Sequence, residues 1–144
     1  MAPTMNISYD QAPYDVRQDI AHTHCNTWDH IAAPGTWLSG ERRVAIAAET
    51  RHAAGCALCQ ERKAALSPYA VKGDHDDLGD LPDAVIEMIH RIVTDPGRIT
   101  QSWVDGLIAG GIAEPDYVEM VGVIVHTMCV DGFTDTLGMP RHAL

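Results

Sequence analysis

The sequence has few basic residues and no long hydrophobic run, and both features exclude classes of partner. It contains 10 Lys and Arg residues against 20 Asp and Glu residues, so the formal net charge at pH 7 is −10. Nucleic acids and anionic membranes bind surfaces rich in Lys and Arg, so we expect neither as a partner. No apolar segment approaches the roughly 20 residues that a membrane-spanning helix requires.

Cysteine is also scarce, with four residues in a chain of 144. Secreted disulfide-rich domains have more cysteines in a shorter chain, so that class is not expected. Residues 1–19 are polar and acidic, and they lack the basic start and apolar stretch of a secretory signal peptide. The sequence therefore favours a cytoplasmic protein.

Turn residues divide the chain into helical segments of one all-α domain, residues 1–144. Residues 1–14 are expected to form an irregular arm, and residues 67–81, rich in Gly, Pro and Asp, a surface loop over the preceding helix. No segment alternates as a strand does. The predicted bundle has five to six helices, at about 15–32, 40–53, 56–66, 83–93, 100–110 and 115–137.

The most informative motif is Cys56-Ala57-Leu58-Cys59. Two thiols at this spacing can form a disulfide, hold half of a metal site, or alternate between the two redox states. Gly55 interrupts the preceding helix, so Cys56 is expected at a helix N-terminus, where the partial positive charge favours thiolate. The alternative is a pair of inert thiols packed in the core.

Reactive side chains surround this motif at steps of three or four residues, the spacing of one helical face. If the helix continued without a break, Lys63 would lower the pKa of a thiol as an adjacent cation, and Glu49 or His52 would carry the proton. In the alternative, Glu49 and His52 face solvent or pair with nearby arginines. The candidate catalytic residues on this face are Glu49, His52, Cys56, Cys59 and Lys63.

A second group lies in the apolar segment 120–130. His126 and Cys129 are one helical turn apart there, and His126 is a further catalytic candidate if this segment lies opposite the cysteine pair. Cys56, Cys59, His126 and Cys129 would then be suitable ligands for zinc or iron, which makes a metal-binding protein an alternative function. Otherwise His126 is a core histidine bonded to a carbonyl, and the chain has no cofactor beyond a redox-active disulfide.

The order of these features resembles the alkylhydroperoxidase D-like and carboxymuconolactone decarboxylase superfamily. The resemblance covers roughly residues 37–138. It is carried by the segments 40–59 (GERRVAIAAETRHAAGCALC), 95–100 (DPGRIT) and 111–121 (GIAEPDYVEMV), in this order. It implies an all-α fold and a homo-oligomer, whether dimer, trimer or hexamer.

The resemblance also implies an activity. Peroxidase members attack a hydroperoxide with the second cysteine of the motif, and the first cysteine then converts the resulting sulfenic acid to a disulfide. By this resemblance Cys59 would be the attacking thiol and Cys56 the resolving thiol. A thiol reductant protein would then reduce the disulfide. The family's Glu, His and His relay positions hold Val44, Leu58 and Lys63 here. We therefore predict a thiol–disulfide enzyme of low activity on a peroxide or small disulfide. A lactone decarboxylase-like enzyme, which does not need the cysteine pair, is the alternative, and a purely structural oligomer is another.

Apolar surface independently predicts a homo-oligomer. The segment 118–130 is nearly apolar on most faces, and such a helix must be covered on all sides. Trp28, Trp37 and Trp103 are large apolar side chains suited to subunit contacts. In the alternative, the N-terminal helix covers this surface within one chain.

Overall fold

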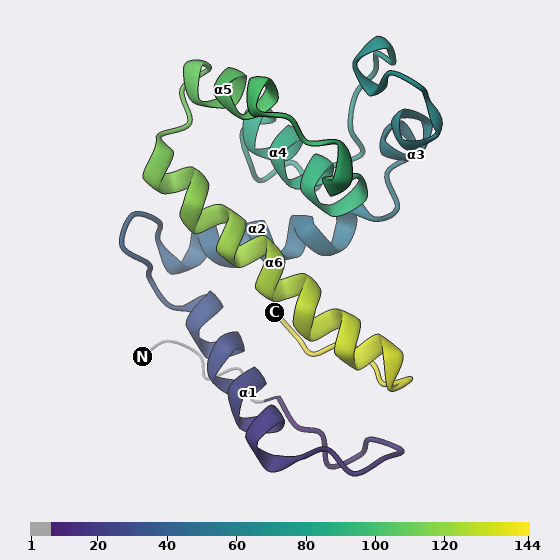
Figure 1. Cartoon of the computed structure of the whole chain (residues 1–144). Helices are drawn as coiled ribbons and strands as arrows, with labels where there is room; N and C mark the ends of the chain where they lie inside the picture. The colour runs from purple at the N-terminus through teal and green to yellow at the C-terminus, as the bar shows by residue number, and fades with distance from the viewer. Residues whose placement is uncertain (1–6) are drawn as a thin grey trace.

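A computed structural model describes residues 7–144, and all regular structure within them is helical (Figure 1). Residues 1–6 of the predicted arm lie outside the described residues, and residues 7–14 form no helix or strand. The predicted all-α bundle is thus confirmed. None of the helices in this range is long and apolar enough to cross a membrane. The elements are α1 (Gln18–Ala32), α2 (Gly40–Ala53), α3 (Ala57–Ala64), η1 (Pro68–Ala70), α4 (Asp83–Thr94), η2 (Pro96–Arg98), α5 (Gln101–Ala109) and α6 (Glu114–Thr136).

Helix boundaries follow capping signals in the sequence. The Ser39 hydroxyl accepts a hydrogen bond from the Arg42 N–H at 3.2 Å and begins α2, and Thr100 does the same for Trp103 at the start of α5. Each cap satisfies one of the backbone donors that a helix start leaves unpaired. Pro115 lies in the first turn of α6, where its missing N–H costs no hydrogen bond.

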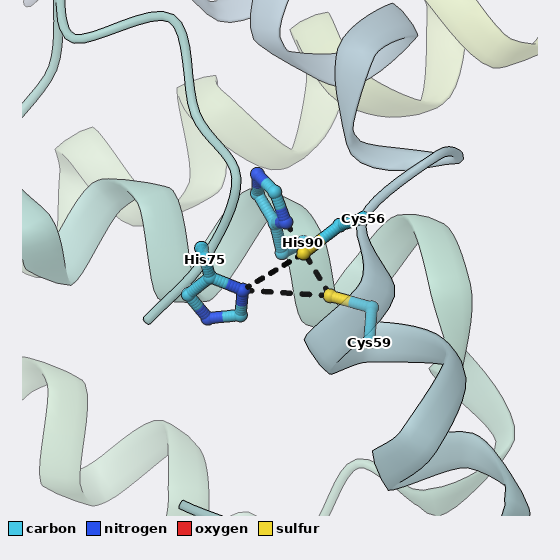
Figure 2. Close-up of side chains that lie close together, drawn as sticks. All are labelled: Cys56, Cys59, His75 and His90. Atoms are coloured by element: carbon cyan, nitrogen blue, oxygen red, sulfur yellow. Dashed lines mark hydrogen bonds between the residues drawn. The ribbon is translucent and has the colours of Figure 1, made fainter. Parts of the chain in front are cut away.

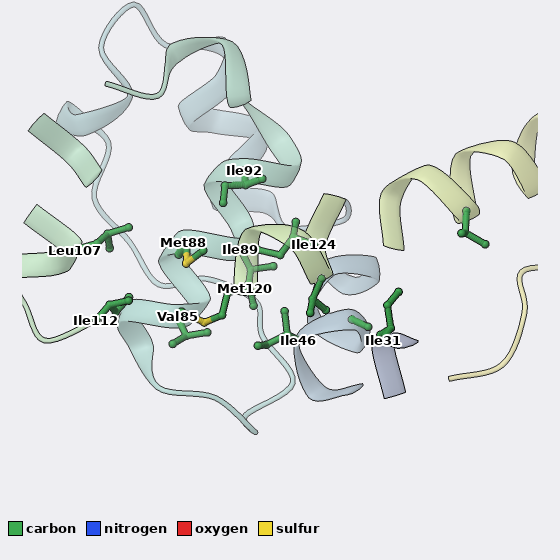
Figure 3. Packing of buried hydrophobic residues seen from close by; sticks show 14 of the residues in the cluster. Ile31, Ile46, Val85, Met88, Ile89, Ile92, Leu107, Ile112, Met120 and Ile124 are labelled. Carbon is green, nitrogen blue, oxygen red and sulfur yellow. The ribbon is translucent and has the colours of Figure 1, made fainter. Parts of the chain in front are cut away.

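The core forms where α2 packs against α1, α4 and α6. Ile46 of α2, Met88 and Ile89 of α4, and Ile124 of α6 are completely buried and meet in this layer (Figure 3). Full burial of each such side chain contributes about 1.5–3 kcal/mol. This layer fixes α2 and α4 relative to one another, and these two helices carry three residues of the site described below, Glu49, Glu87 and His90.

A buried ion pair joins the turn between α1 and α2 to α6. Arg43 donates to the backbone oxygens of Ile31 and His30, both at 3.0 Å, and lies 3.5 Å from the Glu119 carboxylate. Glu119 also accepts the Leu38 N–H at 2.9 Å. Both charged groups therefore have hydrogen-bond partners, which offset the free energy that their burial costs.

α3 lies at the periphery of the bundle, beside α4 (Figure 1). The Arg98 guanidinium donates to three carbonyls at the C-terminal end of α3, those of Ala65, Arg62 and Lys63, at 2.7, 2.8 and 3.1 Å. Carbonyls at a helix end have no partner within the helix, so a cation there stabilises the helix and fixes its position. Asp95 holds the same guanidinium at 2.7 Å.

One of the three tryptophans differs from the sequence-based expectation. Trp28 is completely buried within the chain and donates its indole N–H to the Ala143 carbonyl at 2.8 Å, so it is not available for subunit contacts. Trp37 is 57% exposed, and Trp103 is half-buried. α1 packs on part of α6, as the single-chain alternative requires. Three apolar side chains of α6 nevertheless stay exposed: Val118, Val125 and Met128.

The homo-oligomer stays a prediction, and this exposed strip on α6 is where we expect the contact. Light scattering should give a mass that is a multiple of the 15.6 kDa chain. Val125→Glu should shift the mass towards one chain, because a charge cannot be buried unpaired in an apolar contact. Leu66→Glu, at a fully exposed apolar residue after α3, is the control and should leave the mass unchanged. A wild-type mass near 15.6 kDa would contradict the prediction.

Candidate functional site

Two cysteines and two histidines from three segments converge between α3 and α4 (Figure 2). Cys56 immediately precedes α3, Cys59 lies in its first turn, His75 comes from the segment between η1 and α4, and His90 lies in α4. The four donor atoms lie within 4.8 Å of one another. Both cysteines and His90 are buried, and the His75 side chain is 11% exposed.

Cys59 has the closer contacts with the imidazoles. Its Sγ lies 3.3 Å from Nδ1 of His90 and 3.4 Å from Nδ1 of His75. Cys56 Sγ lies 3.7 Å from the same Nδ1 of His75 and accepts the Asp76 N–H at 3.4 Å. One thiol is therefore flanked by two imidazoles, and the other by one imidazole and a backbone donor.

A carboxylate stands behind each imidazole. Nε2 of His90 lies 2.7 Å from Oε1 of Glu49, and Nε2 of His75 lies 2.5 Å from Oε2 of Glu87. An ionised carboxylate only accepts hydrogen bonds, so each Nε2 carries the hydrogen and each ring is held with Nδ1 towards the sulfur atoms. The site thus contains two connected Glu–His–Cys arrays that share Cys59.

The two carboxylates also secure the segment that carries His75. Glu49 accepts the Leu78 N–H at 3.0 Å. Glu87 accepts from Nη1 of Arg62 at 3.0 Å, and Nε of Arg62 donates to the Val71 carbonyl at 3.2 Å. The segment between Val71 and Leu78 is therefore held at both ends, on either side of His75.

These contacts shift the proton equilibria of the site. Burial alone would raise the pKa of Cys59, but hydrogen bonds from His75 and His90 outweigh it and bring the pKa to about 6. Burial opposes charge on the imidazoles, yet bonds to Cys59 and the carboxylates raise the pKa of His75 to about 10 and of His90 to about 9. The hydrogen bond from His75 lowers the pKa of Glu87 to about 2. At neutral pH the site therefore pairs a thiolate with imidazolium groups.

A small cavity opens beside Cys59. Its volume is about 10 Å³, the size that one water molecule requires. Arg91 borders it and is 5% exposed, and its Nε and Nη2 have no hydrogen-bond partner. Such buried unpaired donors cost about 1–3 kcal/mol each, so a small oxygen-bearing molecule in this cavity would be stabilised. The lining residues are Cys59, Arg62, His75, Glu87, Arg91 and Thr94.

The predicted catalytic face is brought together only in part. Glu49 reaches the site through His90, and the alternative in which it faces solvent is wrong. The helix does not continue through Gly55, so the five residues do not share one helical face. Lys63 is exposed on α3, and the groups that lower the Cys59 pKa are His75 and His90 instead. His52 lies at the rim, 3.3 Å from the Asp76 carboxylate.

The structure also corrects the predicted metal ligands. His126 and Cys129 are exposed on α6 and are not members of the four-residue cluster. The residues that meet Cys56 and Cys59 are instead His75 and His90, separated from them in the chain by the segment 60–74 and from one another by 76–89. A Cys-x-x-Cys pair followed by two histidines at such distances is a sequence signal for a metal or thiolate site, although the spacing alone does not show which histidines take part.

Comparisons with models of known protein families, with curated proteins and with solved structures find no match for this chain. Membership of the alkylhydroperoxidase D-like superfamily therefore stays a prediction, and the chemistry below is argued from the geometry of the site.

The burial of Glu49 generates a stability prediction for the reduced, metal-free chain. Glu49→Ala should lower the free energy of unfolding by about 3–5 kcal/mol, because it leaves the His90 ring buried without its partner. Glu41→Ala, at an exposed position of the same helix, is the matched control and should cost less than about 1 kcal/mol. Urea unfolding measures both variants, and equal small losses would contradict the buried pairing.

Proposed function

We propose that the chain is a thiol–disulfide redox enzyme in which Cys59 reduces a hydroperoxide and Cys56 closes the disulfide. The observation that carries this proposal is the position of Cys59 Sγ, 3.3 and 3.4 Å from two imidazoles that are each backed by a carboxylate. Such arrays activate a nucleophile and supply a proton to its leaving group. They take the place of the relay residues that the resemblance led us to seek at Val44, Leu58 and Lys63.

In the first step the Cys59 thiolate attacks one oxygen of the hydroperoxide ROOH. The S–O bond forms, the O–O bond breaks, and the leaving alkoxide takes a proton from an imidazolium to become ROH. Cys59 becomes a sulfenic acid. Arg91 lines the cavity beside Cys59 and has two unpaired N–H donors, and turned to the cavity these donors would stabilise the charge that develops on the leaving oxygen.

In the second step the Cys56 thiolate attacks the Cys59 sulfenic sulfur. The S–S bond forms, and hydroxide leaves with a proton from the second imidazolium as water. The two sulfur atoms lie within 4.8 Å, so only a local movement at the start of α3 is needed. A dithiol reductant, either a small molecule or a protein, then reduces the disulfide by thiol exchange and is itself oxidised. The same exchange allows a small disulfide to replace the peroxide as substrate, and the need for a reductant favours a reducing compartment such as the cytoplasm.

The size of the cavity and the charges of the site distinguish this function from its alternatives. The cavity of about 10 Å³ has room for one water molecule, so a small peroxide would need a local opening of the site, and a lactone would need a far larger one. Inert core thiols would not require a fully buried histidine–carboxylate pair, Glu49 with His90, which costs free energy to bury. Both observations favour redox chemistry on a small oxidant.

Cysteine variants test the assignment through peroxide consumption by the metal-free chain with excess dithiothreitol. Cys59→Ser should abolish turnover because it removes the nucleophile. In the absence of dithiothreitol, reduced Cys56→Ser should consume one equivalent and leave a sulfenic acid that dimedone traps. Cys129→Ser, at an exposed cysteine outside the site, should retain the wild-type rate. Full steady-state turnover by Cys59→Ser would contradict the proposed role of this residue.

A further inference from the structure

We propose that Cys56, Cys59, His75 and His90 also form a tetrahedral zinc site, and that bound zinc keeps the cysteine pair in a closed, unreactive state. The four donor atoms lie within 4.8 Å of one another, and three of the sulfur–nitrogen distances are 3.3, 3.4 and 3.7 Å. A zinc tetrahedron with Zn–S of about 2.3 Å and Zn–N of about 2.0–2.1 Å has S···N edges of about 3.6 Å. These three pairs are therefore already close to the spacing that the ion requires.

The surroundings of the cluster favour the same ion. Both imidazoles present Nδ1 to the sulfur atoms while a carboxylate holds Nε2, which is the arrangement that orients histidine ligands in zinc proteins. The Asp76 N–H bonds Cys56 Sγ and would support a thiolate ligand. Two thiolates balance the charge of Zn²⁺. Calcium and magnesium prefer oxygen ligands, so this set of two sulfur and two nitrogen atoms does not suit them.

Zinc in this site would hold the two thiolates in an unreactive state, which we call the lock, and would not act as a catalyst. Four protein ligands complete a tetrahedron and leave no position for a substrate, which is the pattern of structural zinc. The ion would also join the His75 segment to α3 and α4 (Figure 2). The locking role, unlike zinc binding itself, rests on the proposed redox function.

Oxidation would keep the site empty once zinc has dissociated. The freed thiolates of Cys56 and Cys59 together lose two electrons to a hydroperoxide and form one S–S bond. The hydroperoxide and two protons become one alcohol and one water. A disulfide is a poor zinc ligand, so re-binding requires reduction by a dithiol.

Cobalt titration of the reduced, metal-free full chain tests the site. One equivalent of Co²⁺ should produce the intense visible absorption of tetrahedral cobalt with a thiolate charge-transfer band, and Zn²⁺ should abolish both.

His75→Gln should weaken cobalt binding at least tenfold. This side chain lies at the rim of the site, so the variant should fold, and circular dichroism checks that it does. His126→Gln and Cys129→Ser, at exposed positions outside the cluster, should bind as the wild type does. Failure to bind one equivalent, an octahedral spectrum, or unchanged binding by folded His75→Gln would overturn the zinc site.

Alkylation of the two cysteines separates this inference from the redox function. One equivalent of Zn²⁺ should slow the reaction of Cys56 and Cys59 with iodoacetamide at least tenfold, and peptide mass spectrometry measures it without any turnover. Unchanged alkylation would overturn the lock. If zinc protects but the metal-free chain consumes no peroxide, the redox function fails and the zinc site stands. If peroxide is consumed but no zinc binds, the redox function stands and the zinc site fails.

Discussion

The pairing of two imidazoles with two carboxylates, the buried Glu49 and the partly exposed Glu87, is the constraint on which the rest of the site depends. The side chains of Glu49 and His90 are 1% and 0% exposed, and an unpaired charge there would cost several kcal/mol. Each ring must therefore turn one nitrogen to its carboxylate, which turns the other nitrogen to the cysteines. The same carboxylates hold Leu78 and Arg62, so the course of the segment around His75 follows from this pairing.

The proposed redox chemistry and the proposed zinc binding would use one geometry. Hydrogen bonds to the two imidazoles keep the Cys59 thiol ionised, and a metal ion would meet the same thiolate and the same Nδ1 atoms with their protons removed. The unpaired donors of Arg91 beside the small cavity favour an oxygen-bearing substrate and have no role in holding zinc. The two states therefore use different parts of the same surroundings.

The sequence predicted those features that depend only on residues close together in the chain. The caps at Ser39 and Thr100, the break at Gly55 and the position of Cys56 at a helix start depend on local backbone geometry, and the structure confirms them. His75 and His90 were not predicted because only the packing of α3 on α4 brings them to the cysteines. His126 illustrates the converse: an apolar segment indicates a helix, but periodicity did not show which face of α6 would be buried.

The most direct test of the central claim is a nuclear Overhauser measurement between the His75 and His90 rings in the reduced, metal-free chain with labelled histidine. The ring centroids lie 4.4 Å apart, although His75 belongs to an irregular segment and His90 to a helix. The account predicts strong cross-peaks between the ring protons, lost in Glu87→Ala, which releases His75. If these cross-peaks are absent from the folded wild-type chain, the two histidines do not meet at the cysteine pair and the account is wrong.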